Sequence, residues 1–185
     1  KNDETVKDSI ENADETKKED EKGPSFSENT YRDVKSSDWH YEAVKFAYEN
    51  NIMQGTDKGF EPDISMTRAM FITVLWRMEN KPSVNYAISF EDVNPEEWYA
   101  EAVRWAASEN IISGLSDTVF GKDEKITREQ TAAVLYRYIK TKQGEEEKEN
   151  DNSLSFEDAG EISDFALTAM TWAVNMGIIK GKTDR

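Results

Sequence analysis

Three stretches of the chain repeat one pattern of apolar and polar positions. In each stretch the apolar residues fall at positions i, i+4, i+7 and i+8, which lie on one face of a helix with 3.6 residues per turn. The sequence therefore predicts three equivalent amphipathic helices, and we call each the first helix of its unit. Their apolar stripes are Trp39/Ala43/Phe46/Ala47, Trp98/Ala102/Trp105/Ala106 and Phe165/Ala169/Trp172/Ala173.

Both ends of these helices carry sequence signals. In the second unit, Asn94-Pro95-Glu96-Glu97 matches an N-cap, a proline and two acids, so we expect that helix to begin at Pro95. Each first helix is followed by a residue type that accepts a left-handed backbone, then by an apolar pair and a glycine. We expect the pair to fold back onto the helix and the glycine to make a second tight turn. The end residues are Asn51, Asn110 and Gly177, and the glycines are Gly55, Gly114 and Gly181.

A second helix is predicted in the first two units, where Thr67-Arg68 and Thr127-Arg128 each precede an apolar stripe. Thr127 has Gln130 at the spacing of a capping box, whereas Thr67 lacks the reciprocal partner. A pair of short helices cannot bury its stripes alone, so we expect the units to pack together. The third unit stops a few residues after Gly181, and we therefore expect its first helix to expose an apolar face.

These patterns divide the chain into an all-α series of units. Residues 1–29 hold ten acids and five lysines with few apolar side chains, which favours a disordered acidic tether. Helix–loop–helix units are predicted at residues 30–80 and 89–140, an acidic linker at 141–153 and a truncated third unit at 154–185.

The composition excludes several classes of function. The 185 residues include 23 Lys and Arg against 38 Asp and Glu, which gives a net charge of −15. Nucleic acids and anionic lipid surfaces both require a basic face, so we expect neither as a partner. The longest mainly apolar run, residues 69–76, is far shorter than the ~20 residues that span a bilayer, so we expect no membrane insertion. With no cysteine and one histidine, we expect no thiol nucleophile, histidine triad, metal or cofactor.

Each unit also opens with an aromatic residue, a variable residue and an aspartate, in Tyr31-Arg-Asp-Val34, Phe90-Glu-Asp-Val93 and Phe156-Glu-Asp-Ala159. Together with the aromatic residue at the first helix, the apolar pair with its glycine and the Thr-Arg pair, these segments resemble the S-layer homology (SLH) module. The resemblance covers roughly residues 31–78, 90–138 and 156–185. It implies tandem modules in a pseudo-threefold arrangement around a central helical bundle, with the third module incomplete.

The resemblance also implies a function. SLH modules anchor exported bacterial proteins to the cell wall without covalent attachment, so the chain is expected to be extracellular, at the cell wall or in the surface layer. Their ligand is a secondary cell-wall polysaccharide that bears pyruvate ketals, held in grooves between neighbouring modules. The resemblance further implies a larger parent surface protein with other domains, and no catalytic residue.

The Thr-Arg pair at each second helix is the strongest candidate binding element. The first N–H groups of a helix have no intrahelical partner and carry partial positive charge. A guanidinium beside them suits bidentate binding of a carboxylate, such as that of a pyruvyl ketal. In the SLH motif Thr-Arg-Ala-Glu the arginine contacts the ligand, and this role carries over to Arg68 and Arg128, with Thr67 and Thr127 beside them. The alternative is a solvated or salt-bridged arginine.

Four other candidate ligand-binding residues have competing structural interpretations. Trp39 and Trp98 offer flat faces for sugar C–H groups, but each also begins an apolar stripe, for which core packing is the simpler explanation. Asp33 and Asp92 could accept hydrogen bonds from sugar hydroxyls, or equally from backbone N–H groups in the turn before the helix.

Two glycines and one departure from the motif complete the candidate site. Gly55 and Gly114 would let a ligand approach the backbone closely, although turn geometry alone also explains them. The glutamate of the SLH motif is absent, because Met70 and Gln130 stand at its position and Glu129 stands where the alanine would be. Any contact that this glutamate makes in the family is therefore in doubt here.

Two other classes of function compete with a sugar-binding anchor. A glycan-processing enzyme would need two carboxylates, one of them with a raised pKa in a sugar-sized cleft. Acids such as Asp92 and Glu97 lie instead in turns and first helical turns, where they serve as ordinary caps. The main alternative is a protein-interaction module that assembles surface-layer subunits through the exposed face of the third unit.

Overall fold

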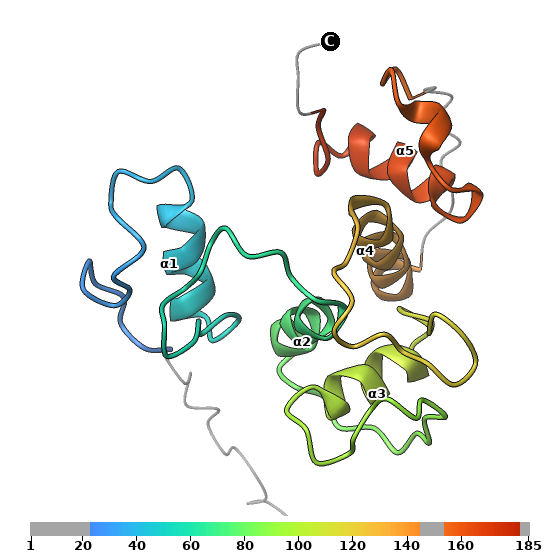
Figure 1. The fold of residues 1–185 in the computed structure, drawn as a ribbon, viewed down its shortest axis with the longest axis horizontal. Helices are drawn as coiled ribbons and strands as arrows, with labels where there is room; N and C mark the ends of the chain where they lie inside the picture. Colours follow the sequence, from blue (N-terminus) through green and yellow to red (C-terminus); the bar gives the residue numbers. More distant parts are fainter. Residues whose placement is uncertain (1–22, 145–153, 182–185) are drawn as a thin grey trace, which may run out of the picture.

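The computed structural model describes residues 23–144 and 154–181, and all regular structure within them is helical. Figure 1 shows the first helix of the first unit on one side of the molecule, and the second helix of that unit on the opposite side together with the other two units. In the described part of the chain no sheet forms, and the fold is all-α, as predicted. The helices are α1 (Tyr41–Glu49), α2 (Arg68–Met78), α3 (Ala100–Ser108), α4 (Arg128–Gln143) and α5 (Leu167–Asn175), with short 3₁₀ helices η1 (Ala159–Glu161) and η2 (Asp164–Ala166).

α2 and α4 begin at the Thr-Arg pairs, as predicted. The Thr67 hydroxyl accepts a hydrogen bond from the Met70 N–H at 3.2 Å and so caps α2. Thr127 and Gln130 form the reciprocal capping box on α4. Each cap satisfies backbone donors that the helix cannot, which is worth about 1 kcal/mol.

The first helices begin later than predicted. α3 begins at Ala100 rather than at Pro95. The Asn94 side chain accepts a hydrogen bond from the Glu96 N–H at 3.1 Å, which closes a turn ahead of the helix. A second turn follows, in which the Ala100 N–H donates to the Glu97 carbonyl. The predicted start was wrong because an asparagine side chain bonds as readily in a turn as at a helix N-cap.

The predicted ends of the first helices are confirmed. The backbone is left-handed at Asn51, Asn110 and Gly177, with φ of 57°, 56° and 69°. The apolar pair after each of them folds back, because both N–H groups of the pair donate to one carbonyl within the helix. These donors are Ile52 and Met53 to Ala47, Ile111 and Ile112 to Ala106, and Ile178 and Ile179 to Ala173.

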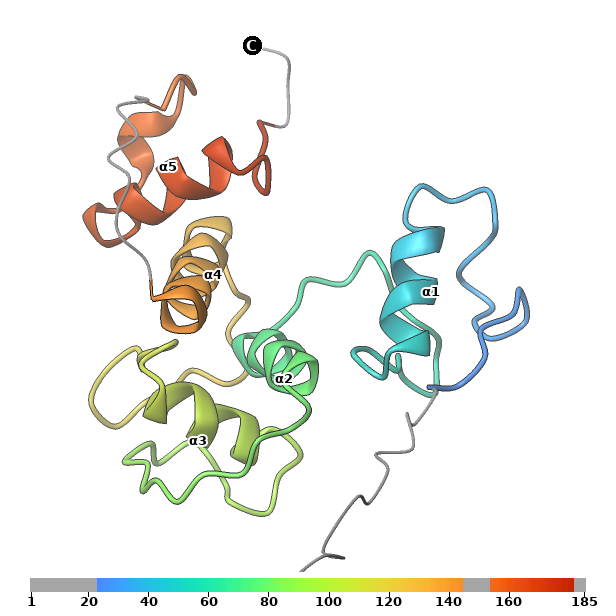
Figure 2. The same cartoon turned by 180° about the vertical axis from the view of Figure 1, so that it is seen from behind.

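The units pack through a repeated pair of helices. The second helix of one unit lies on the first helix of the next, so that α2 packs against α3 and α4 against α5 (Figures 1 and 2). In the larger core, Ile72 of α2 and Val103 of α3 are fully buried together with Phe120 of the next loop. In the smaller core, Ala132 of α4 and Ala173 of α5 are likewise fully buried. The units therefore pack together, as expected.

The third unit's first helix is covered, contrary to the prediction. Ala169, Met170 and Ala173 of α5 are buried in the core that they share with α4. The helix without a helical partner is α1, which touches none of the other helices in the described residues. The prediction was wrong because the first helices α3 and α5 are covered by the second helix of the unit before them, not by a second helix of their own unit.

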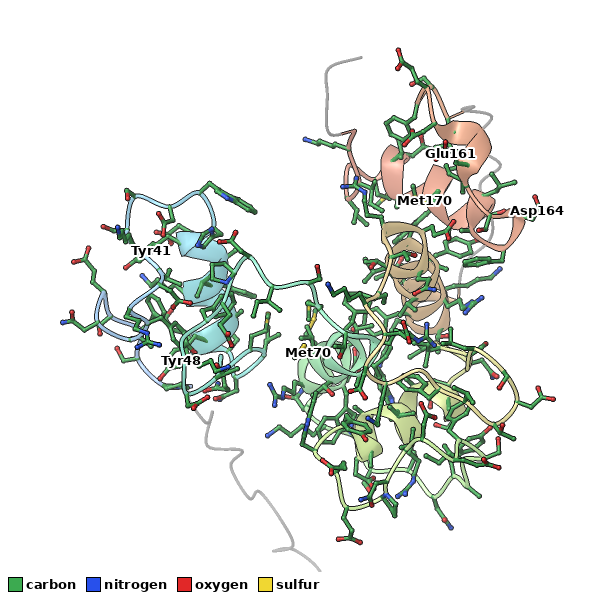
Figure 3. All side chains as sticks on the ribbon, in the orientation of Figure 1. Tyr41, Tyr48, Met70, Glu161, Asp164 and Met170 are labelled. Atoms are coloured by element: carbon green, nitrogen blue, oxygen red, sulfur yellow. The ribbon has the colours of Figure 1, made fainter. Side chains whose placement is uncertain are left out.

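A separate aromatic cluster supports α1. Phe26, Tyr31, Val34 and Val44 are buried together, and the Phe26 ring meets the Tyr48 ring edge-on at 5.7 Å between centroids. Tyr48 lies on α1 (Figure 3). Phe26 therefore belongs to the first unit, although the sequence placed it in a tether of residues 1–29.

Other parts of the predicted organisation are only partly described. Residues 141–143, which we placed in the acidic linker, form the end of α4. The predictions for residues 1–22, 145–153 and 182–185 lie outside the described residues. The pseudo-threefold arrangement stays a prediction. None of the described helices combines the length and the apolar character that a membrane span requires.

Candidate functional site

An arginine crosses each junction between units in the same way. The Arg68 guanidinium donates through Nη2 to the Ser113 carbonyl at 2.7 Å, and the Arg128 guanidinium donates through Nη2 to the Lys180 carbonyl at 2.6 Å. Ser113 and Lys180 occupy equivalent positions, each directly before the glycine that follows the apolar pair. The two candidate arginines therefore both lie at boundaries between neighbouring units.

Arg68 is buried within its junction. Only 4% of its surface is exposed, its Nε also donates to the Phe120 carbonyl at 3.0 Å, and its guanidinium lies 5.0 Å from the centre of the Phe120 ring. Burial lowers the pKa of Arg68, and the nearby carboxylate of Asp92 opposes that shift. Arg68 therefore holds the first and second units together.

Arg128 is exposed and lines a groove between the second and third units. The groove has a volume of ≈ 590 Å³ and lies between the start of α4 and the third unit. Glu161 and Met170 contribute to its third-unit side (Figure 3). Besides these three residues the groove is lined by Thr127, Glu129, Phe156, Glu157, Asp158, Ile162, Ile179, Lys180 and Gly181.

The equivalent cleft between the first and second units is smaller, ≈ 360 Å³. Thr67 and Met70 line it from the start of α2, and Asp92, Trp98 and Lys122 line it from the second unit. Arg68 is not among the residues that line this cleft. The two junctions are therefore built alike, but within residues 23–144 and 154–181 only the second presents its arginine to a groove.

The candidate tryptophans lie on the surface. Trp39 is 94% exposed and Trp98 is 54% exposed, so core packing is the wrong interpretation for both. Phe165, at the same position of the third unit, is 56% exposed. The aromatic side chain leaves the apolar stripe because each first helix begins two residues after it, at Tyr41 in the first unit. All three units therefore present a flat apolar side chain to solvent at one position.

The candidate aspartates bond the loops of their own units. Asp33 accepts hydrogen bonds from the Phe60 and Glu61 N–H groups at 3.0 and 2.7 Å. Burial alone would raise the pKa of Asp33, but the backbone N–H donors outweigh burial and hold this pKa below its ordinary value. This geometry supports the turn interpretation of Asp33.

Asp92 repeats this arrangement in the second unit. Its carboxylate accepts hydrogen bonds from the Phe120, Gly121 and Lys122 N–H groups at 2.7, 2.8 and 3.3 Å. Burial again raises the pKa of Asp92, and the backbone donors again outweigh it, so the pKa lies below its ordinary value. Asp92 differs from Asp33 in that it also lines a cleft.

The candidate glycines are in tight contact with protein atoms. Gly55 has a left-handed φ of 64°, and a Cβ there would lie 2.7 Å from the Tyr31 ring. A Cβ at Gly114 would lie 2.4 Å from the Ser116 carbonyl oxygen and 2.5 Å from the Phe90 ring. Close packing inside each unit therefore requires glycine at both positions, and the ligand-binding role of the two residues stays a prediction.

Glu129 is a junction residue that we did not single out as a site residue. Its carboxylate accepts hydrogen bonds from the Ser163 N–H at 3.0 Å and the Ser163 hydroxyl at 3.2 Å. Ser163 directly precedes η2, so a residue of α4 holds the residue before the short helix of the next unit. One signal in the sequence pointed to the role of Glu129. The SLH motif has an alanine at this position, which the first unit keeps as Ala69 and the second unit replaces by an acid.

Comparisons with known proteins agree with this arrangement of repeated units. Over 154 residues the chain is 31% identical to the exoglucanase XynX of Acetivibrio thermocellus, an alignment that covers 83% of this chain and 14% of that protein. It is 30% identical over 152 residues to the surface-layer 125 kDa protein of Lysinibacillus sphaericus, covering 80% of this chain and 12% of that protein. With the cellulosome-anchoring protein of Acetivibrio thermocellus it shares 30% identity over 129 residues, or 68% of this chain and 28% of that protein.

These relatives are much longer than the chain, which spans less than a third of each of them. The S-layer homology domain matches three segments of the chain, residues 30–70, 89–132 and 155–185. Each segment contains one first helix, and the two boundaries between the segments are the junctions that Arg68 and Arg128 cross. The chain belongs to the S-layer homology family, with one match in each of its three repeated units.

Proposed function

We propose that the chain anchors an exported bacterial protein to the cell wall without covalent attachment, by binding a pyruvate-bearing cell-wall polysaccharide between its modules. Family membership and relatives named for a surface layer and for cellulosome anchoring support attachment at the cell surface. The observation that carries sugar binding is the exposed Arg128 guanidinium, in a groove between two modules and at the N-terminus of α4. In this proposal the chain itself is not an enzyme.

The chemistry of Arg128 suits the carboxylate of a pyruvyl ketal. One nitrogen, Nη2, is held by the Lys180 carbonyl, and within the described residues Nε and Nη1 have no hydrogen-bond partner. The bond to Lys180 fixes the guanidinium, so that less side-chain entropy is lost when a ligand binds. The positive end of α4 adds to the attraction of an anion. Each charge-assisted hydrogen bond contributes ~1.5–3 kcal/mol.

The acids of the same groove give it affinity for hydroxyl groups. Glu157, Asp158 and Glu161 are exposed and line the groove on the third-unit side. Ionised carboxylates only accept hydrogen bonds, so they suit the hydroxyl donors of a sugar ring. A ring that carries one carboxylate and several hydroxyls matches one arginine faced by several acids. A free polyanion matches this groove less well, because the acids repel it.

We propose the second groove as the principal ligand site, because the cleft between the first and second units lacks an exposed arginine. Arg68 bonds two carbonyls and is buried, so it would have to leave its junction to reach a ligand. Trp98, Thr67 and Lys122 remain at that cleft and could contact a second sugar by stacking and hydrogen bonding. Trp39, Gly55 and Gly114 have no groove position in this proposal.

The pseudo-threefold arrangement of the modules is part of the same proposal. It is supported by the repetition of the junction: the same Nη2 contact, the same pairing of a second helix on the next first helix, and a cleft at each boundary. Repeated contacts of one kind generate a regular rotation from one module to the next.

A binding assay with purified polysaccharide tests the proposed ligand. Cell-wall polysaccharide is immobilised before and after chemical removal of pyruvate, and the bound fraction of the chain is measured. We expect retention on the native polysaccharide and loss of binding after depyruvylation. Equal retention on both materials would refute carboxylate recognition. Retention on cell walls stripped of all polysaccharide would favour the alternative, a protein–protein assembly module of a surface layer.

A further inference from the structure

The loop ahead of α1 encloses a pocket of its own, which we call the loop pocket. It has a volume of ≈ 440 Å³ and is lined only by residues 28–36 of the first unit. Tyr31 and Val34 of its lining are buried in the aromatic cluster, which ties this wall of the pocket to the core of the first unit. The rest of the lining is exposed and polar: Glu28, Asn29, Arg32, Lys35 and Ser36.

The loop pocket has more cations than acids, although the whole chain carries a net charge of −15. Arg32 and Lys35 line it with a single acid, Glu28. The two grooves between units have the opposite balance, with four acids in each against one cation in the first and two in the second. Because salt screens exposed charges beyond ~8–10 Å, the two cations dominate the field inside the loop pocket. The pocket therefore attracts an anion.

The guanidinium of Arg32 is held in place while most of its donors stay free. Its Nε donates to the Lys58 carbonyl at 2.9 Å, and within the described residues Nη1 and Nη2 have no hydrogen-bond partner. The Lys35 backbone N–H donates to the Asp38 carboxylate at 2.7 Å, but in the described part of the chain its ammonium is unpaired. A guanidinium that is already fixed loses less side-chain entropy when a ligand binds.

The fold of a unit does not require these two cations. Arg32 stands between the aromatic residue and the aspartate of its opening segment, where the second and third units have Glu91 and Glu157. Lys35 stands where the second unit has Asn94. The second unit nevertheless forms the same aspartate-bonded loop as the first. The positive charges of the first unit are therefore available for binding.

The loop pocket is separate from the grooves between units. Asp92 and Trp98 line the cleft between the first and second units, whereas their first-unit equivalents, Asp33 and Trp39, do not line the loop pocket. The segment that forms the pocket also lies on the side of the molecule away from α4 and α5 (Figures 1 and 2). A ligand in the Arg128 groove therefore does not occupy this pocket.

We propose that the loop pocket binds a phosphate group, with Arg32 and Lys35 as its binding residues. Phosphate oxygens accept two hydrogen bonds from the free Nη1 and Nη2 of the guanidinium and a further one from the ammonium, which acts as a point charge. The Asn29 amide and the Ser36 hydroxyl line the same pocket as neutral donors. A single carboxylate has only two oxygens and one charge, so it matches two cations less well.

Two sources carry this chemistry, a phosphodiester of a cell-wall polymer and free phosphate. Neither involves Arg128, so the loop pocket and the proposed sugar groove can fail independently of each other.

Titration of the full chain, followed through the amide proton and nitrogen shifts of residues 28–36, tests the site. The probes are inorganic phosphate, the phosphodiester bis(glycerol) phosphate and pyruvate, each at up to about 20 mM, a range that detects millimolar affinity. Sodium chloride keeps the ionic strength constant. We expect saturable shifts with phosphate and about tenfold weaker binding of pyruvate. Saturation by the phosphodiester as well identifies a wall polymer as the source, and saturation by inorganic phosphate alone identifies free phosphate.

Three variants test the binding residues. Arg32→Glu should weaken phosphate binding about tenfold or more, and the repeat itself supplies a glutamate at this position in two other units. Lys35→Gln should weaken it about threefold or more, and it decides the outcome if Arg32→Glu loses helix content in circular dichroism. Lys58→Gln is the matched control, because it removes a positive charge from an exposed side chain of the same unit that does not line the pocket. It should change the affinity by less than about twofold.

Three results would overturn the phosphate site. One is the absence of saturable shifts in residues 28–36 with both inorganic phosphate and the phosphodiester. Another is a set of shifts that sodium chloride alone reproduces, because general screening would then explain them. The third is an unchanged phosphate affinity in folded Arg32→Glu and Lys35→Gln chains.

Discussion

Two residues of one motif differ in their surroundings. Arg68 and Arg128 follow a threonine cap and donate to equivalent carbonyls, yet Arg68 is buried under Phe120 and Arg128 is exposed. In the second unit, the Phe120 carbonyl and ring enclose the guanidinium of Arg68. The residues that follow Gly181 at the equivalent place of the third unit lie outside the described residues. A buried arginine with two acceptors stabilises the fold, whereas an exposed arginine with free donors can bind a ligand.

Replacing each arginine by alanine should separate these two roles. Arg68→Ala leaves the Ser113 and Phe120 carbonyls unpaired and removes a buried side chain, so we expect the free energy of unfolding to fall by about 2–4 kcal/mol. Arg128→Ala should lower it by less than about 1 kcal/mol. Urea denaturation followed by circular dichroism measures both. Equal losses in the two variants would contradict the assignment of Arg128 as the ligand-binding residue.

The pKa shifts of Asp33 and Asp92 predict loss of stability in acid. Both pKa values lie below the ordinary value because backbone N–H groups stabilise the carboxylates. A depressed folded-state pKa contributes stability that is complete above the unfolded pKa of about 4 and is lost as the pH falls through the folded pKa. We therefore expect the urea concentration at the unfolding midpoint to decrease when the pH is lowered below about 4.

Asp92→Asn tests the cause of that acid dependence. The variant should be less stable than the wild type at pH 7, because an amide accepts the three N–H groups less well. Its deficit should shrink as the pH falls, since the wild type then loses its carboxylate. A deficit that stays constant between pH 7 and the acid limit would show that the carboxylate charge does not stabilise this loop.

At the scale of elements, the second helix of a unit packs against the first helix of the next unit and not against the first helix of its own unit. α4 covers α5 and also carries Glu129, which accepts hydrogen bonds from Ser163 directly before η2. The equivalent position in α2 is Ala69, whose N–H donates to the Lys122 carbonyl at 3.2 Å instead. The two junctions therefore share their helix pairing but use different polar contacts.

Glu129→Ala should loosen the third unit selectively. The change restores the residue type of the first unit and leaves the Ser163 N–H and hydroxyl without their acceptor. We expect a cost of about 1–2 kcal/mol, with faster amide exchange around residues 163–170 and unchanged exchange in α3. Glu157→Ala, at an exposed acid of the same groove, is the matched control. Uniform loosening of all three units would argue against a local role of the Glu129–Ser163 contact.

The sequence predicted the helices well but not their partners. The 3.6-residue period and the Thr caps located α2 and α4, and the positions of Asn51 and Asn110 located the left-handed turns. These features are local, so a short segment determines them. Which unit covers which helix depends on tertiary packing, which a local pattern does not determine. For that reason we expected the uncovered face on α5, whereas it lies on α1.

The candidate site was predictable only in part for the same reason. The Thr-Arg motif located both arginines at junctions, but nothing local distinguishes the buried Arg68 from the exposed Arg128. The exposure of Trp39 and Trp98 depends on a helix start two residues later than the stripe suggested. Glu129 was visible only as a departure from the motif, and its partner Ser163 lies 34 residues away.

At the scale of the whole molecule, the described residues form two bodies that differ in the size of their hydrophobic cores. α2 pairs with α3 and α4 pairs with α5, and Val134 and Tyr138 of α4 lie in the core of α2 and α3. Glu79 at the end of α2 also accepts hydrogen bonds from Tyr138 and Lys142 of α4. Among the described residues, the part of the first unit around α1 packs into its own aromatic cluster, of which Phe26 and Tyr31 are members. A small cluster without helical cover contributes little buried area.

Native-state amide exchange should therefore separate these two bodies. We expect residues 26–53 to open with a lower free energy than residues 100–112 of the larger core, because local stability follows buried apolar contacts. Arg77 of α2 donates to the Ile52 carbonyl at 3.2 Å and so links the two regions, and Arg77→Ala should widen the difference. Equal opening energies in both regions would show one cooperative body instead.

A calorimetric titration with a pyruvylated wall disaccharide tests the central claim most directly, because it measures whether Arg128 and the ligand carboxylate bind each other. The unmodified chain and Arg128→Ala are each titrated with the disaccharide and with its depyruvylated form, with Arg104→Ala, at an ion-paired surface arginine, as the control. We predict that Arg128→Ala weakens binding of the pyruvylated sugar about 10- to 100-fold and leaves binding of the depyruvylated sugar unchanged. Equal weakening of both sugars, or no weakening of either, would contradict the claim.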